Sequence, residues 1–244
     1  SKIYIVMEEE LGDNAQIKVA TFASRDFAGA GKFDSDVIVF TKQDKDIYAM
    51  AGIIRALKAD ENGNYKMYAS INDAIEQAKD NEKTYFGLFR RQVINSRNTV
   101  KVAKSKDIVL VDCRENAEGA VVLRDSSYQD FMFVVNGSLE FTTLSEDFLK
   151  AHNLKLNDGT ACHPMILEGN KNSSSVSASM FYVSGGTLKL SNETTVQNSK
   201  ADQIYIDNMI SVKDENFEAS TLGYGGVIWM KDGEVVVDNS TFDN

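Results

Sequence analysis

Phe-Met-Phe-Val-Val-Asn-Gly-Ser-Leu-Glu-Phe, residues 131–141, is the first of three segments that can be laid over one another. The second, residues 180–190, reads Met-Phe-Tyr-Val-Ser-Gly-Gly-Thr-Leu-Lys-Leu, and the third, residues 227–237, reads Val-Ile-Trp-Met-Lys-Asp-Gly-Glu-Val-Val-Val. Each combines an apolar strand, a polar turn that ends in glycine, and a second strand of alternating character. The turn glycines Gly137, Gly186 and Gly233 are separated by 49 and 47 residues, which indicates a repeat protein built from stacked units.

The length of this repeat predicts how the units stack. A period of 47–49 residues suits two coils of a parallel β-helix with about 24 residues each, and the intervening coils are expected at 165–169 and 204–212. Because alternate side chains of a strand point to opposite faces, one set is expected in a shared core: Leu139, Phe141, Leu188, Leu190, Val235 and Val237. Their neighbours are expected to point outward: Ser138, Glu140, Thr187, Lys189, Glu234 and Val236. Three β-hairpins of a sandwich would give the same pattern and remain an alternative.

The part of the chain before the repeats is expected to contain both strands and helices. Alternating or apolar runs predict strands at 2–7, 16–22, 36–41, 85–94, 99–102 and 107–112, and helical spacing predicts helices at 47–58 and 71–79. Residues 148–156 depart from the repeat and predict a loop or short helix that leaves the stack. We therefore expect a mainly β fold: an N-terminal α/β cap or small domain at 1–100, and a right-handed parallel β-helix, truncated at its C-terminus, at 101–244.

Composition narrows the classes of partner. The 244 residues carry a formal net charge of −10, which disfavours nucleic acid and anionic membrane surfaces, because both need a basic footprint. No apolar run approaches 18 residues, so no membrane insertion is expected. The start has neither Met nor a signal-peptide pattern, which suggests a piece excised from a longer protein. Cys113 and Cys162 lie 49 residues apart, which matches the repeat period. With one coil between them, their sulfurs would be too far apart to form a disulfide bond. We therefore expect two buried or half-buried free thiols.

The repeats resemble bacterial surface and autotransporter-type β-helix adhesins, including the repeats of polymorphic outer-membrane proteins. That family carries Gly-Gly-Ala-Ile and Phe-x-x-Asn motifs. Here residues 225–228 read Gly-Gly-Val-Ile and residues 185–188 read Gly-Gly-Thr-Leu, while residues 242–244, Phe-Asp-Asn, stop one residue short of the second motif. The resemblance covers about 115 residues. It implies a surface-exposed, non-catalytic domain that binds ligands or serves as a stalk. We also expect the domain to be located at the cell surface or secreted, to be a monomer and to need no cofactor.

No residue set predicts a catalytic or metal centre. His152 and His163 could join Cys162 or Asp158 at a metal, but no ligand pair has metal spacing, which favours isolated loop histidines. A β-helix hydrolase needs clustered carboxylates. One coil's length supplies Asp202, Asp207, Asp214 and Glu218, but corner Asp and Asn residues are also common because they tolerate turn geometry.

Aromatic side chains supply the candidate binding residues: Tyr182, Tyr205, Tyr224 and Trp229. Tyr182 and Trp229 align in the repeat, and so does Phe133, which suits either a binding strip on one face or a stack in the interior. We expect a non-catalytic, adhesin-type domain that binds a host or matrix glycan or protein through a face or loop near the cap. The alternatives are a polysaccharide lyase or glycoside hydrolase, and a structural stalk without a ligand.

Overall fold

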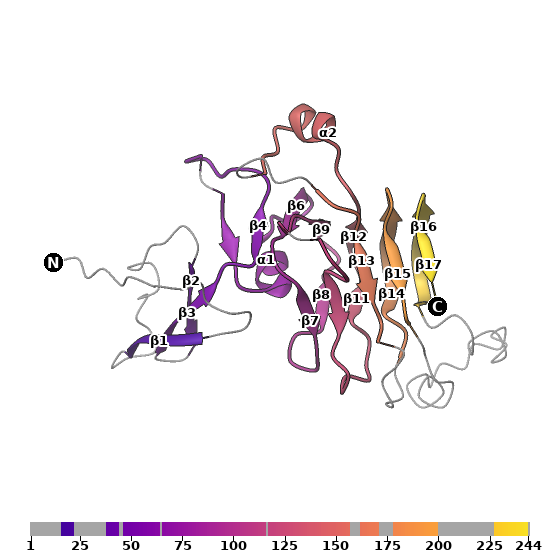
Figure 1. Ribbon diagram of the computed structural model, residues 1–244, viewed down its shortest axis with the longest axis horizontal. Helices are drawn as coiled ribbons and strands as arrows, with labels where there is room; N and C mark the ends of the chain where they lie inside the picture. Colours follow the sequence, from indigo (N-terminus) through magenta and orange to yellow (C-terminus); the bar gives the residue numbers. More distant parts are fainter. Residues whose placement is uncertain are drawn as a thin grey trace.

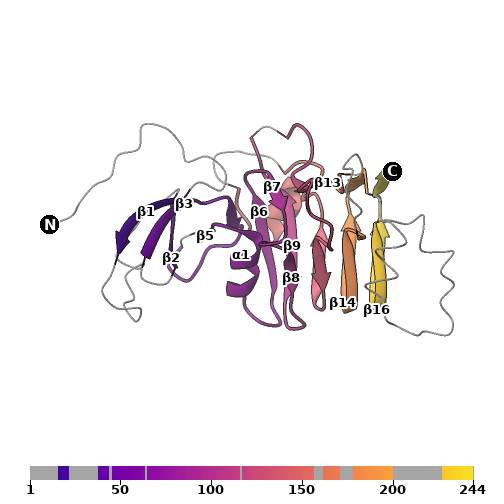
Figure 2. The same cartoon turned by 90° about the horizontal axis from the view of Figure 1, so that it is seen from below.

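The computed structural model of the chain describes residues 16–21, 38–43, 46–63, 65–115, 117–156, 162–170, 178–199 and 227–243. The fold is mainly β. Its parallel strands follow one another along the longest axis of the molecule, in the order of the sequence (Figure 1). Figure 2 shows the same succession from a second direction, with β14 beside β16 near the C-terminus. The strands expected at 2–7 and 204–212 lie outside the described residues.

The N-terminal strands form a separate antiparallel sheet with the order β1-β3-β2. Its members are β1 (Gln16–Thr21), β2 (Ile38–Gln43) and β3 (Asp46–Ala51). The strands expected at 16–22 and 36–41 are thus confirmed, but the helix expected at 47–58 is wrong. That range contains β3, which pairs with strands on both sides, and β4 (Ile54–Ala56), which pairs with β5 (Met67–Tyr68) and β6 (Lys83–Leu88). Pairing with distant strands outweighs the local helical spacing of the apolar residues.

The helix expected at 71–79 is confirmed as α1 (Ile71–Gln77), and Ser70 caps it by accepting a hydrogen bond from the backbone of Asp73. The buried side of α1 joins the main hydrophobic core. The side-chain amide of Asn72 donates to the carbonyl of Thr99 at 2.9 Å and accepts from the backbone N–H of Lys101 at 3.3 Å. These backbone groups lie in and beside β8 (Val100–Val102), which is an edge strand. A side chain of α1 therefore provides hydrogen-bond partners for backbone groups at that edge.

Two sheets with parallel pairing make up the stack. In the larger sheet, β6 begins a parallel series that continues through β9 (Asp107–Asp112), β12 (Ser138–Phe141), β14 (Phe181–Ser191) and β16 (Ile228–Asp238). β8 and β11 (Phe133–Val135) join the same sheet beside the first half of β14. The second sheet holds β7 (Gln92–Ile94), β10 (Val122–Arg124), β13 (Ile166–Glu168), β15 (Thr195–Gln197) and β17 (Thr241–Asp243).

Of the core residues expected from the repeat, the column of Leu139, Leu188 and Val235 is confirmed, and Phe141 and Leu190 are also buried. The expectation is wrong for Val237, which lies in the last strand of the larger sheet and is 47% exposed. Leu139 pairs in parallel register with Leu188, which pairs in turn with Val235. Leu139 and Leu188 are fully buried, and Val235 packs against the same cluster. The turn glycines also follow this register, because Gly186 pairs with Gly233.

The expectation of two coils per repeat is wrong. β12 and β14 carry successive repeats and pair directly, and so do β14 and β16, so each repeat adds one layer to the stack. The strand at 165–169, expected in an intervening coil, is β13, which pairs with β10 and β15 in the second sheet. The repeat is long because segments leave the stack between strands. The clearest is α2 (Glu146–Ala151), which confirms the short helix expected near 148–156.

The first strand of the repeat is shifted by one residue from the sequence alignment. Phe133 pairs with Phe181, and Val134 pairs with Tyr182, so Phe133 does not share a column with Tyr182 and Trp229 as expected. The reason lies in the turn: three residues separate the paired positions in β14, whereas two separate them between β11 and β12. Phe133 is fully buried and stacks on Phe181 with a ring-centroid distance of 5.0 Å.

Candidate binding site

The candidate site lies on the outward face of the larger sheet. A row of paired positions runs across this face from Tyr85 through Val109 and Glu140 to Lys189. The residues on either side of this row, such as Leu139 and Leu188, point into the core. Since side chains alternate along a strand, the row faces away from the core, as expected for Glu140 and Lys189.

The segment that carries α2 folds back over part of this face. Ser145 caps α2 by accepting from the backbone of Phe148, with two acidic residues in the first turn, where the helix dipole favours them. Leu149 and Leu154 belong, together with Val109 of β9, to a second apolar cluster outside the main core. This cluster fixes the α2 segment against the sheet and makes it one wall of a hollow.

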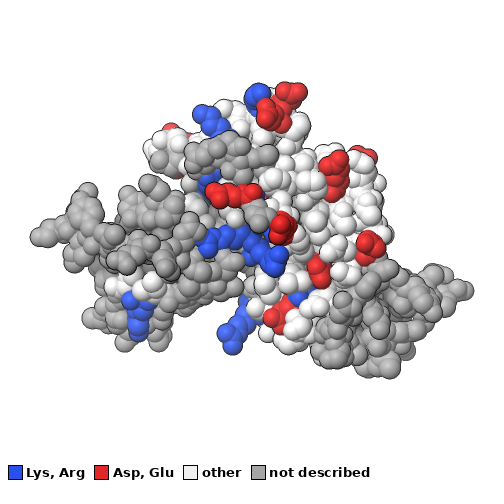
Figure 3. All heavy atoms as spheres, viewed as in Figure 1, with Lys and Arg blue, Asp and Glu red and all other residues white. Residues whose placement is uncertain are grey.

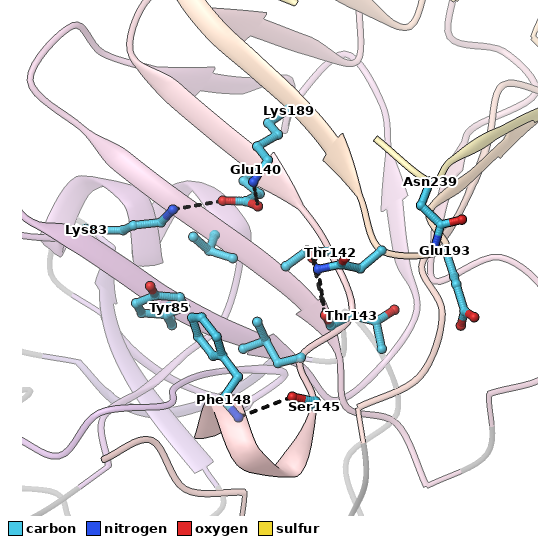
Figure 4. A pocket seen from close by; sticks show the side chains of 13 residues that line it. Lys83, Tyr85, Glu140, Thr142, Thr143, Ser145, Phe148, Lys189, Glu193 and Asn239 are labelled. Carbon is cyan, nitrogen blue, oxygen red and sulfur yellow. Dashed lines mark hydrogen bonds and ion pairs between the residues drawn. The ribbon is translucent and has the colours of Figure 1, made fainter. Parts of the chain in front are cut away.

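The hollow is a pocket of about 480 Å³ between α2 and the turns that follow β12 and β14 (Figure 4). Tyr85, Leu144 and Phe148 form an apolar wall, with the rings of Tyr85 and Phe148 5.9 Å apart. The opposite side is polar and carries these residues: Thr142, Thr143, Asn192, Glu193 and Asn239. Lys83, Glu140 and Lys189 line one end. The pocket thus pairs aromatic surface with hydroxyl, amide and charged groups.

Glu140 is held by three side chains at once. Its two carboxylate oxygens accept from Lys83 at 2.8 Å and from Lys189 at 2.7 Å (Figure 4), and Ser191 donates to it at 3.0 Å. Its side chain is only 9% exposed, whereas those of Lys83 and Lys189 are 44% and 38% exposed. The carboxylate is therefore fixed in place, while both ammonium groups keep access to solvent.

These contacts set the charge state of the site. Burial alone would raise the pKa of Glu140, but the hydrogen bonds from Lys189 and Lys83 outweigh burial and lower that pKa. Burial would lower the pKa of Lys83, but its bond to Glu140 raises it. The directions of these two shifts keep Glu140 and Lys83 charged near neutral pH. Acidic and basic side chains also lie next to one another near the centre of the face in Figure 3.

The lowered pKa makes Glu140 a source of acid sensitivity. Its stabilising contribution is complete above the ordinary value of 4.5 and is lost as the pH falls through the lower pKa of the folded state. The free energy of unfolding of the wild type should fall when the pH is lowered from about 6 to about 3. We expect Glu140→Gln to show a smaller fall, by on the order of 1 kcal/mol. The difference is modest because solvent screens the partly exposed lysines. Urea unfolding at both pH values measures this. Glu146→Gln, in an exposed pair with Lys150, is the control, and equal acid sensitivity of wild type and Glu140→Gln would contradict the assignment.

Asparagines shape the polar rim of the pocket. Asn192 and Asn239 have φ of 49° and 48°, in the left-handed region that asparagine tolerates better than most residues. Asn192 donates from its amide to the hydroxyl of Thr142 at 3.0 Å, and its backbone N–H donates to Asp238 in the next layer. The sequence-based view that corner asparagines serve turn geometry is confirmed at these two positions.

The predicted aromatic strip lies elsewhere on the stack. Tyr182 and Trp229 are paired and half-buried, and their rings stack at 4.6 Å and 15°. Phe131 stacks on Tyr182 at 5.1 Å. The ring of Tyr182 thus packs against the rings of Phe131 and Trp229, which also stack on each other with a centroid distance of 5.8 Å. Tyr205 and Tyr224, the other predicted binding residues, lie outside the described residues, as do the carboxylates Asp202, Asp207, Asp214 and Glu218.

The cysteines and histidines do not form a metal centre in the part of the chain that the structure describes, where no three potential ligands gather. His152 stacks on Phe148, and His163 forms an isolated antiparallel bridge with Asp112. Cys113 is buried and Cys162 half-buried, both as free thiols, as expected. Their expected separation is wrong: the sulfurs are 3.9 Å apart, because the chain returns from α2 alongside the end of β9.

Sequence reasoning placed Glu140 and Lys189 on the outward face but did not identify them as a site. The readable signal was their opposite charge at equivalent positions of successive repeats, which become neighbours once each repeat is one layer. Lys83 and Phe148 had no such signal, because they lie outside the repeat.

No helix among the described residues is both long and apolar enough to cross a membrane.

Comparisons of the chain with protein-family models, with curated proteins and with solved structures found no match.

Proposed function

We propose that this chain is a non-catalytic, adhesin-type binding domain of a cell-surface or secreted protein, and that the pocket beside α2 binds a carbohydrate. The proposal includes a right-handed parallel β-helix as the scaffold and α1 as part of its N-terminal cap. The sequence led us to expect a host or matrix glycan or protein as the ligand, and of these a glycan is the preferred class.

The scaffold proposal is supported by parallel pairing in two sheets at equivalent positions of successive repeats. The interior rows are apolar, and the main core runs continuously from α1 to β16. α1 covers one end, and Asn72 satisfies backbone groups beside β8 that would otherwise be left without partners there. A stack of this kind offers a rigid outer face on which loops can build a site.

The observation that carries the binding proposal is the composition of the pocket. Its volume of about 480 Å³ lies within the range of small-molecule sites, roughly 300–1,000 Å³. Tyr85 and Phe148 offer apolar ring surface to the carbon-bound hydrogens of a sugar, and the amides and hydroxyls opposite can exchange hydrogen bonds with its hydroxyl groups. Two lysines and two glutamates line the pocket, so its formal charge is balanced, which favours a neutral glycan.

An enzyme is the second candidate, because Glu140 and Glu193 both line the pocket and glycoside hydrolysis uses two carboxyl groups. The environment of Glu140 argues against a role as general acid. A general acid needs a raised pKa, whereas Lys189 and Lys83 lower the pKa of Glu140. The lone pairs of the carboxylate are also occupied by Lys83, Lys189 and Ser191. We therefore assign Glu140 to fixing the two lysines at the pocket and shaping its polar end.

Binding to an array of neutral and acidic oligosaccharides, followed by calorimetry on the best ligand, tests the proposal. We expect Phe148→Ala and Glu140→Gln each to weaken binding about tenfold or more, since one removes ring surface and the other a charge-assisted network. Glu234→Gln is the matched control, because Glu234 is an exposed residue of β16 outside the pocket. Thermal unfolding of each variant separates loss of binding from loss of fold.

The outcomes separate the candidate functions. Loss of binding in Trp229→Ala, with Phe148→Ala unaffected, would move the site to the aromatic stack of Tyr182 and Trp229. Release of reducing ends or unsaturated products from the bound glycan would favour the lyase or hydrolase. A chain that binds none of the glycans and none of a panel of matrix proteins would support the stalk.

A further inference from the structure

We propose that Cys113 and Cys162 form a disulfide bond that fastens the segment carrying α2 to the end of strand β9. The bond would be a covalent modification of the wall of the pocket. The inference rests on the geometry of the two cysteines and does not depend on the proposed function.

The backbone already holds the two cysteines together. Cys113 directly follows β9, and the backbone N–H of Cys113 donates to the carbonyl of Leu88. Cys162 precedes His163, whose backbone N–H donates to the carbonyl of Asp112 at 2.9 Å. The sulfurs are 3.9 Å apart, so they need to approach by roughly 2 Å to reach bonding distance, a movement that side-chain rotation can supply.

The surroundings favour a bond between these two sulfurs. The chain contains two cysteines in all, so neither has another intramolecular partner. Cys113 lies in the outer apolar cluster with Val111 and Leu144, against which Cys162 packs. Asp112, the charged neighbour of Cys113, is neutralised by Arg114 at 2.7 Å, and both side chains are nearly fully buried.

The thiols differ in a way that sets the order of the reaction. The hydrogen bond from Cys113 lowers the pKa of Cys162, and the same bond, together with burial, raises the pKa of Cys113. Half-buried Cys162 is thus the attacking thiolate toward a disulfide oxidant such as oxidised glutathione. Its sulfur breaks the oxidant's S–S bond and releases one glutathione thiol. Cys113 then displaces the second, so the protein loses two protons and two electrons and two glutathione thiols form.

The bond would close a long loop that contains all of α2. Such a cross-link stabilises the folded state mainly by restricting the unfolded chain. The segment from Ser145 to Cys162 would then be fastened at both ends, by the continuous strand β12 and by the disulfide. We expect slower amide hydrogen exchange in α2 and a higher melting temperature, by about 5–10 °C, in the oxidised protein.

The test uses the full chain equilibrated with mixtures of oxidised and reduced glutathione. Intact mass, peptide mapping after blocking free thiols, and gel shift with a maleimide reagent measure the bond. We expect one intramolecular disulfide joining the Cys113 and Cys162 peptides, favoured about 100-fold more in the native chain than in the urea-unfolded chain. Cys162→Ser, at the half-buried position, is the control, and the oxidant should leave its melting temperature unchanged.

Three results would overturn the proposal. One is a glutathione adduct on Cys162 that does not proceed to the internal bond, and another is a dimer linked between chains. The third is an internal bond that is no more stable in the native than in the unfolded chain. Because each is read from covalent chemistry, they are independent of whether any glycan binds.

Discussion

Replacing Gly186 with alanine is expected to destabilise the fold by about 3 kcal/mol or more, one of the largest effects of any small substitution in the chain. A Cβ at Gly186 would lie 2.2 Å from the carbonyl oxygen of Gly137 and 2.7 Å from the carbonyl carbon of Asn136. Both are backbone atoms of the neighbouring layer, so neither can move without disturbing the strand pairing. Equilibrium unfolding in urea measures the loss.

Gly185 provides the matched control, because it is the adjacent residue of the same turn. Its φ is +85°, and the nearest atom to an added Cβ is Asp232 Oδ2 at 3.9 Å. Gly185→Ala is therefore expected to cost only the left-handed backbone strain, about 1–2 kcal/mol. A larger loss in Gly185→Ala than in Gly186→Ala would contradict the close approach of the layers at this corner.

Replacing Arg114 with methionine is expected to destabilise the fold by about 3–5 kcal/mol, because it leaves the buried carboxylate of Asp112 without its positively charged partner. The guanidinium holds Asp112 through Nε at 3.0 Å and Nη2 at 2.7 Å, and it also donates to the carbonyls of Glu118 and Gly119. Asp112 is completely buried, so water cannot replace the lost bonds. Urea unfolding near neutral pH gives the difference.

Two variants make this result specific. Lys150→Met breaks the exposed pair with Glu146, whose side chains are 73% and 88% exposed, and is expected to change stability by less than about 0.5 kcal/mol. Combining Arg114→Met with Asp112→Asn removes the unpaired charge and should recover part of the loss. If Arg114→Met costs no more than Lys150→Met, the ion pair is not buried as described.

The stacking of the repeats could be predicted from the sequence, but the number of layers that each repeat adds could not. The glycines at 137, 186 and 233 and the alternating strands after them predicted the column of Leu139, Leu188 and Val235. The period of 47–49 residues was interpreted as two coils, because a sequence does not distinguish a second coil from a segment that leaves the stack. The α2 segment leaves the stack in this way. Its short helix was predicted, but not that it lengthens the repeat without adding a second coil.

The errors near the N-terminus and at the site have one physical cause, which is contact between residues distant in sequence. The apolar residues of 47–58 have helical spacing, but β3 and β4 instead pair with other strands. Gly52, which lies between β3 and β4, was the sequence signal that a regular element is interrupted there. Glu140 was predicted to face outward, and it does, yet its side chain is buried because Lys83, Lys189 and Ser191 hold it. Cys113 and Cys162 meet for the same reason, since the chain returns beside β9.

The measurement that tests the central claim most directly is the nuclear Overhauser effect between the methyl groups of Leu139, Leu188 and Val235 in methyl-labelled protein. Adjacent parallel strands lie about 4.8 Å apart. The account, in which each repeat is one layer, predicts direct effects from Leu139 to Leu188 and from Leu188 to Val235. It predicts none of comparable strength from Leu139 to Val235. Absence of both nearest-neighbour effects would contradict the layer assignment and, with it, the outward face on which the pocket is built.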